Sequence, residues 1–316
     1  MNKNTKIIMS LGILLFLILA IVGIVFVGVI LFPNTNSTNG ISWGGNEVAI
    51  IELDGPIKLK SDEGSIFSGG EVGVKEYIDL IDEAEKDNNI KAIVLKVNSP
   101  GGEVIASEKL ANKVKEASEK KPVVSYIETI GASGAYMTVA PSTYIIAEKH
   151  SIVGSIGVIM DLIQYYELQK KIGINTTTIK AGKYKDIGSP NRPMTKEEKE
   201  ILQNMTNEIY NDFVKWVSDN RNISLNRTYQ IAQGKIYSGY DAQKVGLVDE
   251  VGTEDDAIKK AGELANISGK PATVELKVKS SNNLLFGVSL NDLVYSLGYG
   301  IGKGIALTND KIISFS

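Results

Sequence analysis

The chain has 316 residues, 43% of them hydrophobic and 22% charged, which excludes a disordered protein and allows one large or two ordinary domains. It contains no cysteine, so disulfides, thiolate metal sites and cysteine nucleophiles are excluded. The single histidine excludes paired-histidine metal motifs, and we expect no metal. The net charge is −3, so the chain has no excess of basic residues for binding phosphates, and we expect no nucleic-acid partner.

An uncharged apolar run near the amino terminus predicts a membrane anchor. The run extends from Ile7 to Phe32, whereas a helix needs only about 20 residues to span a bilayer. It is longer than the roughly 7–15-residue core of a secretory signal, and it ends in Phe32-Pro33-Asn34, which is no small-residue cleavage site. We therefore expect an uncleaved transmembrane signal anchor over residues 7–32.

The charges around this run predict its orientation. Lys3 and Lys6 precede it, and no charge follows before Glu47, so residues 1–6 should be cytoplasmic and the remainder outside. We thus expect a single-pass protein of the cell membrane with an extracytoplasmic domain.

The chain beyond the anchor divides by composition into three parts. Residues 33–46 are rich in Asn, Ser, Thr and Gly and predict a flexible stalk. Residues 47–279 carry alternating strand and helix patterns and should form the folded domain. The role of the apolar, glycine-rich tail at 280–316 stays uncertain.

Apolar periodicity predicts the elements of this domain. Short apolar or β-branched runs predict strands at Val48–Leu53, Ala92–Leu95, Pro122–Ile127, Thr143–Ala147, Ile174–Ile179 and Thr273–Val278. Helical spacing predicts helices at Val74–Ala84, Ile105–Ala117, Asp161–Ile172, Thr195–Val217, near Tyr229 and at Glu254–Leu264. Strands that alternate with helices predict an α/β fold with mainly parallel strands.

Two glycine-containing turns follow predicted strands. In the first, Gly101 and Gly102 come just after the buried strand that ends at Val97. Glycines at the carboxyl end of a strand let the backbone approach a ligand, although an ordinary tight turn would have the same sequence.

The second turn is Gly131-Ala132-Ser133-Gly134-Ala135, which surrounds one serine with small residues after a strand. A nucleophile needs a sharp turn, an exposed hydroxyl and little bulk around it, and the N–H of Gly134 could then stabilise an oxyanion. The alternative is a simple helix-capping role for Ser133.

A serine nucleophile requires a base, and lysine is the natural candidate here. Cysteine is absent, and His150 lies at a predicted strand end, where we interpret it as a loop residue. A buried lysine can lose its proton near neutral pH. The segment from Ala181 to Pro190 carries Lys183 and Lys185, although any single lysine is more commonly a solvated loop residue.

Taken together, these stretches resemble the signal peptide peptidase A (protease IV) family in its short, single-repeat form. The similarity covers about Val48 to Ala261. The shared motifs are Ile90 to Gly102, Ala132 to Tyr136, Gly154 to Val158, Tyr184 to Asp186 with Ser189-Pro190, and Gly239 to Ala242 with Gly246 to Glu250. The family pattern has glycine where Ala135 stands, which leaves the serine intact.

The resemblance implies a Ser–Lys serine endopeptidase without metal or cofactor. By it Ser133 is the nucleophile and Lys185 the general base, Gly102 and Gly134 supply the oxyanion hole, and Ser155 supports the lysine. The implied substrates are peptides, specifically signal peptides left in the membrane after secretion. Two alternatives stay open: a crotonase-like acyl-CoA enzyme and a non-catalytic membrane scaffold.

The resemblance also implies a fold and an assembly. The fold is a Clp protease/crotonase-like spiral of ββα units, preceded by one transmembrane helix. Short members of the family form homo-oligomeric rings or domes in which the serine and the lysine of one site come from adjacent subunits. We therefore expect Ser133 and Lys185 to lie far apart within one chain.

Overall fold

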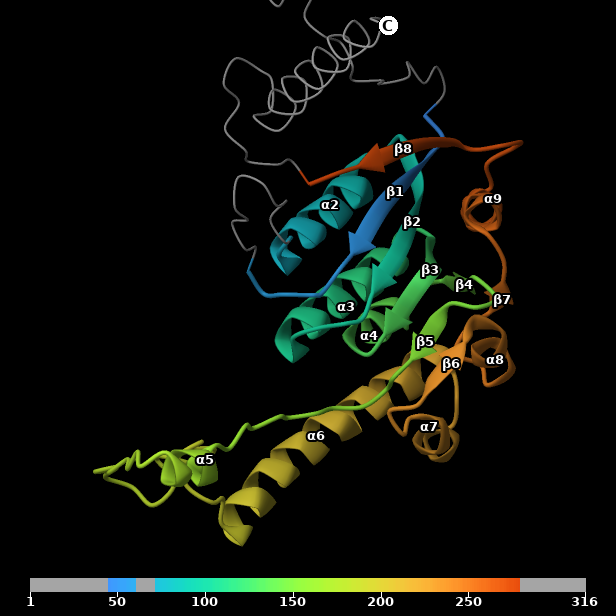
Figure 1. The fold of residues 1–316 in the computed structure, drawn as a ribbon. Helices are drawn as coiled ribbons and strands as arrows, with labels where there is room; N and C mark the ends of the chain where they lie inside the picture. The colour runs from blue at the N-terminus through green and yellow to red at the C-terminus, as the bar shows by residue number, and fades with distance from the viewer. Residues whose placement is uncertain (1–44, 61–71, 279–316) are drawn as a thin grey trace, which may run out of the picture. The chain divides into compact units, whose positions relative to one another are not determined.

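A computed structural model describes residues 45–60 and 72–278 (Figure 1). The chain divides into two compact units, residues 1–43 and 44–316, and every described residue belongs to the second unit. This unit has the predicted mixture of helices and mainly parallel strands, so the α/β prediction is confirmed.

Three predicted segments lie wholly or mostly outside the described residues: the anchor at 7–32, the stalk at 33–46 and the tail at 280–316. Within the part of the chain that the structure describes, no helix is long and apolar enough to cross a membrane.

A single sheet forms the centre of the described unit, with β6-β5-β3-β2-β1-β8 as its main path. Strand β4 pairs with β3 and with β7, and among the described strands only the β5–β6 pair is antiparallel. The strands are β1 (Glu47–Asp54), β2 (Ile90–Ser99), β3 (Val123–Ala132), β4 (Tyr144–Ala147), β5 (Ile152–Gly154), β6 (Ile236–Ser238), β7 (Glu250–Val251) and β8 (Ala272–Leu276). The parallel central strands bring their carboxyl ends to one edge of the sheet.

The central strands are buried on both faces. In β2, Ile93 and Leu95 join one hydrophobic cluster, whereas Ala92 and Val94 join the cluster on the opposite face. Covering both faces accounts for the nearly continuous apolar sequence of this strand, because neither side meets water.

Helices cover both faces of the sheet (Figure 1). The first cluster includes side chains of α2 (Val74–Lys86), α3 (Val104–Ser118) and α4 (Gly134–Val139), and the second includes α9 (Glu254–Leu264). The remaining helices are α5 (Tyr166–Lys171), α6 (Lys196–Arg221), α7 (Leu225–Ile231) and α8 (Gly239–Lys244).

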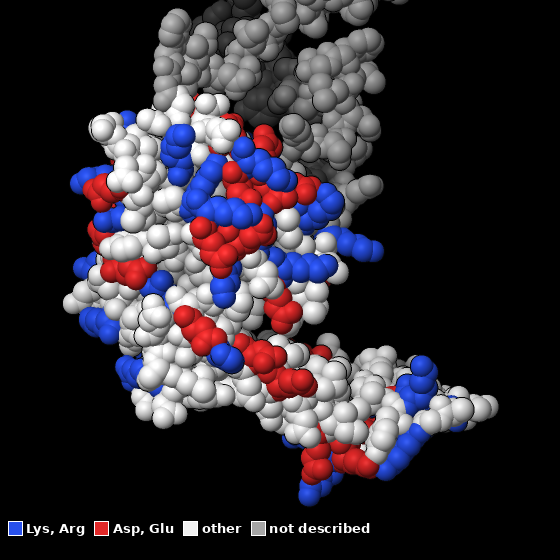
Figure 2. Space-filling view, turned by 180° about the vertical axis from the view of Figure 1, so that it is seen from behind, with Lys and Arg blue, Asp and Glu red and all other residues white. Residues whose placement is uncertain are grey.

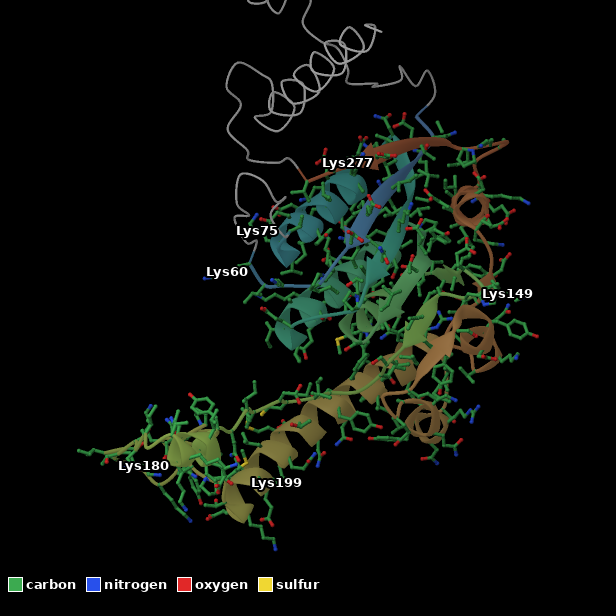
Figure 3. The ribbon with its side chains drawn as sticks, in the orientation of Figure 1. Lys60, Lys75, Lys149, Lys180, Lys199 and Lys277 are labelled. Atoms are coloured by element: carbon green, nitrogen blue, oxygen red, sulfur yellow. The ribbon has the colours of Figure 1, made fainter. Side chains whose placement is uncertain are left out.

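Helix α6 extends beyond the sheet. Its amino terminus has the predicted capping box: Thr195 accepts a hydrogen bond from the Glu198 amide, and the Glu198 side chain accepts one from the Thr195 amide. Its later turns bury Phe213 and Val217 in the core. Residues 156–195, which we call the arm, lead from β5 to the start of α6, and Figure 3 shows Lys180 and Lys199 well away from the sheet.

Two sequence predictions in the arm are wrong. The helix expected at 161–172 is reduced to the six residues of α5. The strand expected at 174–179 does not form, and Ile179 is 96% exposed. A β-branched run becomes a strand only when another strand pairs with it, and no strand of the described residues lies beside this segment.

Candidate active site

Ser133 stands at a strained turn between β3 and α4. Its backbone has φ 53° and ψ −124°, a conformation that side-chain-bearing residues rarely adopt. A 2.8 Å hydrogen bond from its amide to the Gly154 carbonyl fixes the turn to β5, where Ala132 pairs with Gly154. Strain of this kind is concentrated at functional sites, where the surrounding structure holds it in place.

The side chain of Ser133 does not cap the helix that follows. Ser133 occupies the N-cap position of α4, yet its hydroxyl makes no capping hydrogen bond. The helix-capping interpretation is therefore wrong. The hydroxyl instead lines a cavity, in the manner of a nucleophile at a sharp strand-to-helix turn.

The loop after β2 packs directly against this turn. Gly101 has φ 91°, and a β-carbon there would lie 2.5 Å from the Gly134 nitrogen and 2.8 Å from the Ala132 oxygen. Hydrogen bonds from the Ile57 amide to the Gly101 carbonyl and from the Glu103 amide to the Ile57 carbonyl, both 2.9 Å, hold the loop. Only glycine permits this approach.

Two backbone N–H groups beside Ser133 are available as donors. Gly102 and Gly134 both line the cavity, and neither amide donates a hydrogen bond to any described residue. The Gly102 nitrogen lies 3.3 Å from the position that a β-carbon on Gly134 would occupy, so the two residues are in close contact. Paired free amides next to a nucleophile are the components of an oxyanion hole.

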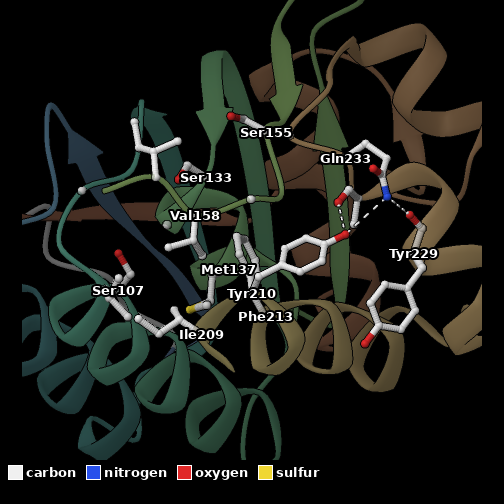
Figure 4. Close-up of a pocket in the computed structure, with 17 residues that line it drawn as sticks. Ser107, Ser133, Met137, Ser155, Val158, Ile209, Tyr210, Phe213, Tyr229 and Gln233 are labelled. Atoms are coloured by element: carbon white, nitrogen blue, oxygen red, sulfur yellow. Dashed lines mark hydrogen bonds between the residues drawn. The ribbon is translucent and has the colours of Figure 1, made fainter. Parts of the chain in front are cut away.

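Ser155 lines the same cavity and also has a left-handed backbone, with φ 50°. Its amide donates a 2.9 Å hydrogen bond to the Lys235 carbonyl, and its side chain has no hydrogen-bond partner among the described residues. The structure thus brings Ser133, Ser155 and the two glycines together, as Figure 4 shows for the serines.

The cavity has a volume of about 620 Å³ and a wall to which polar and apolar groups contribute about equally. At one end Gln233 donates to the Tyr229 carbonyl at 2.6 Å, and the Tyr210 hydroxyl donates to the Ala232 carbonyl at 2.6 Å (Figure 4). The apolar side chains of the wall are Val104, Met137, Val158, Ile159, Ile209 and Phe213. Sequence reasoning missed the contribution of α6, because its periodicity shows an apolar face but not what that face contacts.

Lys185 does not reach this cavity within one chain. Lys183 and Tyr184, its neighbours, bond Glu197 at the amino end of α6. Ile209, the first residue of α6 that lines the cavity, is twelve residues further along the helix, a distance of about 18 Å at 1.5 Å per residue. Ser133 and Lys185 are therefore far beyond the roughly 3 Å that proton transfer requires.

The arm holds Lys185 in an exposed turn. Lys180 pairs with Asp186 and Lys183 with Glu197, whereas the Lys185 ammonium has no hydrogen bond or ion pair to any described residue. Figure 2 shows the arm as the lower lobe, where basic and acidic side chains lie together.

Arg192 fixes this turn to α6. Its guanidinium donates to both Asp186 oxygens at 2.8 Å and also bonds the Glu198 carboxylate. These hydrogen bonds hold the pKa of Asp186 well below its usual range. Arg192 and the Thr195 backbone lower the pKa of Glu198 to about 2.

The other predicted candidates stay outside the cavity. His150 is exposed in the turn before β5 and does not line it. Within residues 45–60 and 72–278, no three His, Asp or Glu side chains gather as metal ligands would.

A family model described as peptidase family S49 matches residues 115–268. A protein of Methanocaldococcus jannaschii named "Putative protease MJ0651" is 57% identical over 93% of this chain and 92% of its own length. The chain belongs to peptidase family S49. It is thus a serine-type protease by family, and the resemblance to signal peptide peptidase A is confirmed.

Other relatives are less similar to this chain. "Serine protease SPPA, chloroplastic" of Arabidopsis thaliana is 31% identical over 84% of this chain and 38% of its own length. "Putative signal peptide peptidase SppA" of Enterococcus faecium is 30% identical over 71% of this chain and 70% of its own.

Solved structures are also similar. One, a mutant of the protein named "1510-N membrane-bound stomatin-specific protease", is 14% identical, with a TM-score of 0.46 over 74% of this chain and 99% of its own. The catalytic domain of the ClpP protease from Plasmodium falciparum is 15% identical, with a TM-score of 0.39 over 65% of this chain and 85% of its own.

Proposed function

We propose that this S49 protease is an endopeptidase with Ser133 as nucleophile and Lys185 as general base. The observation that carries the proposal is the turn at Ser133: a strained residue whose uncapped hydroxyl lines a cavity beside the free amides of Gly102 and Gly134. Acyl transfer needs a nucleophile that attacks the carbonyl carbon and hydrogen-bond donors that stabilise the carbonyl oxygen, and these residues could supply both.

In the proposed reaction the Ser133 oxygen bonds to the peptide carbonyl carbon as Lys185 takes the hydroxyl proton. The carbonyl electron pair moves onto its oxygen, which accepts hydrogen bonds from Gly102 and Gly134. The C–N bond then breaks, and Lys185 gives the proton to the leaving amine. Water, deprotonated by the same lysine, hydrolyses the acyl-enzyme and restores Ser133.

We propose that the lysine of each site comes from an adjacent copy of the chain. A lysine acts as a base only as the neutral amine, which burial favours and exposure to water does not. Lys185 is exposed and has no partner among the described residues, so we propose that a second copy buries it. Ser155, whose side chain lines the cavity without a partner among residues 45–60 and 72–278, would accept a hydrogen bond from the incoming amine.

The surface of the arm supports this assembly. It exposes large apolar side chains that a monomer would leave in water: Ile159 is 85% exposed, Ile163 80% and Ile179 96%. A ring or dome would cover them, and closed cyclic symmetry is the usual form of homo-oligomers.

We propose apolar peptides at the membrane as the substrates, specifically signal peptides left after secretion. The apolar part of the wall, around Met137, Val158 and Phe213, suits apolar side chains. The proposed anchor at residues 7–32 would hold the enzyme at the membrane, with residues 47–279 outside the cytoplasm. The finer fold expectation, a spiral of ββα units after one transmembrane helix, remains part of this proposal.

The test is cleavage of signal-peptide fragments by the full chain in detergent, beside Ser133→Ala. We expect cleavage by the unaltered chain and none by the variant. A fluorophosphonate probe should label the unaltered chain only. Equal cleavage by both proteins would exclude Ser133 as the nucleophile, and coenzyme A binding would favour the acyl-CoA alternative.

Membrane orientation has its own test. Protease added to intact cells or spheroplasts should digest residues 47–279, because the proposed topology places them outside. Protection until the membrane is broken would invert the topology.

A further inference from the structure

Ser107, on α3, has a buried hydroxyl without a partner. The residue is 1% exposed, and its oxygen makes no hydrogen bond to any described residue. It lies in the wall of the cavity that holds Ser133 (Figure 4). Buried hydroxyls are nearly always hydrogen-bonded in native proteins, so an unpaired one requires an explanation, and a catalytic role is one such explanation.

The position of this hydroxyl relates it to the proposed oxyanion hole. A β-carbon on Gly134 would collide with the Ser107 oxygen, would lie 2.9 Å from the Ser107 β-carbon and would lie 3.3 Å from the Gly102 nitrogen. The Ser107 side chain therefore packs directly against Gly134, with the Gly102 nitrogen close by, so its hydroxyl lies next to both proposed oxyanion donors.

Helix formation does not require a serine here. The Ser107 amide already donates a 2.9 Å hydrogen bond to the Glu103 carbonyl, as any residue at this position would. Alanine favours a helix more than serine and would leave no polar atom unpaired. Among the described residues nothing compensates for burying the hydroxyl, and a ligand oxygen in the cavity could do so.

We propose that Ser107 is a third oxyanion donor, an inference that rests on the proposed function. When the Ser133 oxygen bonds to the carbonyl carbon, the π electron pair moves to the carbonyl oxygen. The Ser107 hydroxyl donates a hydrogen bond to that oxygen and keeps its proton throughout. Because the hydroxyl is unpaired before the reaction and paired in the tetrahedral intermediate, it increases kcat and leaves substrate binding unchanged.

The test compares two variants of the full chain in detergent, Ser107→Ala and Ser107→Cys, on an apolar peptide substrate. Cysteine keeps the shape of the side chain, but its thiol is a weak donor. We expect both variants to lose at least about tenfold in kcat, since loss of one oxyanion donor costs about 10²–10³. KM should stay within about twofold. The melting temperature of Ser107→Ala should equal or exceed that of the unaltered chain, because an unpaired polar group is gone.

Several outcomes would overturn the proposal. An unchanged kcat in Ser107→Ala would exclude a donor, and normal kcat in Ser107→Cys would indicate a packing role instead. A melting temperature that falls in parallel with activity would indicate a structural role. Ser133→Ala is the control for the proposed function: if it cleaves as fast as the unaltered chain, or if the unaltered chain is inert, that function fails and this inference with it.

Discussion

Gly101 and Gly134 are in such close contact that a β-carbon on Gly101 would lie 2.5 Å from the Gly134 nitrogen. The contact joins the loop after β2 to the turn after β3, two segments more than thirty residues apart in the chain. The relative position of the two proposed oxyanion donors depends on it.

Gly101→Ala should therefore abolish peptidase activity. The substitution adds left-handed strain of about 1–2 kcal/mol and forces the loop away from Gly134. Gly269→Ala is the matched control, since Gly269 has φ 82° but nothing within 4 Å of its β-carbon position. We expect the control to remain active with a slightly lower melting temperature. Similar activity in both variants would show that the contact is dispensable.

The contacts of Arg192 predict that acid weakens the attachment of the arm to α6. Because the folded-state pKa values of Asp186 and Glu198 are depressed, their contribution to holding the arm is complete above the ordinary carboxyl pKa. It is lost as pH falls from about 4.5 towards the Glu198 pKa of about 2. Limited proteolysis within residues 156–195 should accelerate over that interval.

Arg192→Lys should loosen the arm at neutral pH as well, because an ammonium cannot bond two carboxylates with the geometry of a guanidinium. We expect faster cleavage in the arm and lower peptidase activity, with little change in melting temperature. Lys170→Ala is the control, an exposed arm lysine without a side-chain partner among the described residues. Equal cleavage rates in the two variants would show that Arg192 does not anchor the arm.

The two lysines of the arm turn should differ in function. The hydrogen bond to Glu197 raises the pKa of Lys183 to about 12, so this lysine stays protonated at neutral pH. Lys183→Ala should retain activity within about fivefold, the effect of an exposed ion pair. Lys185→Arg should be inactive, because a guanidinium does not deprotonate in this range. Near-normal turnover by Lys185→Arg would exclude Lys185 as the base.

The sequence predicts the core of this fold well, for a physical reason. In strands such as β2 and helices such as α9, the spacing of apolar residues predicts which side chains are buried. This works because the elements that they pack against lie in the same chain. The arm is predicted poorly for the opposite reason: the β-branched run at 174–179 has no partner strand in the described chain.

Some residues of the candidate site could likewise be predicted from the sequence, whereas others could not. Ser133 and the two glycines are recognisable because strained turns demand small residues at fixed spacing. Ser107 carries no such signal, since its significance depends on the contact between α3 and Gly134. The separation of Lys185 from Ser133 followed from family resemblance and not from any local pattern.

Complementation between subunits tests the shared Ser–Lys site most directly. Chains carrying Ser133→Ala and chains carrying Lys185→Ala should each be inactive alone. After subunit exchange, verified by labelling the two chains differently, the mixture should regain activity wherever an intact Ser133 meets an intact Lys185 of a neighbour. Demonstrated exchange with no recovery at any ratio would contradict a site shared between subunits.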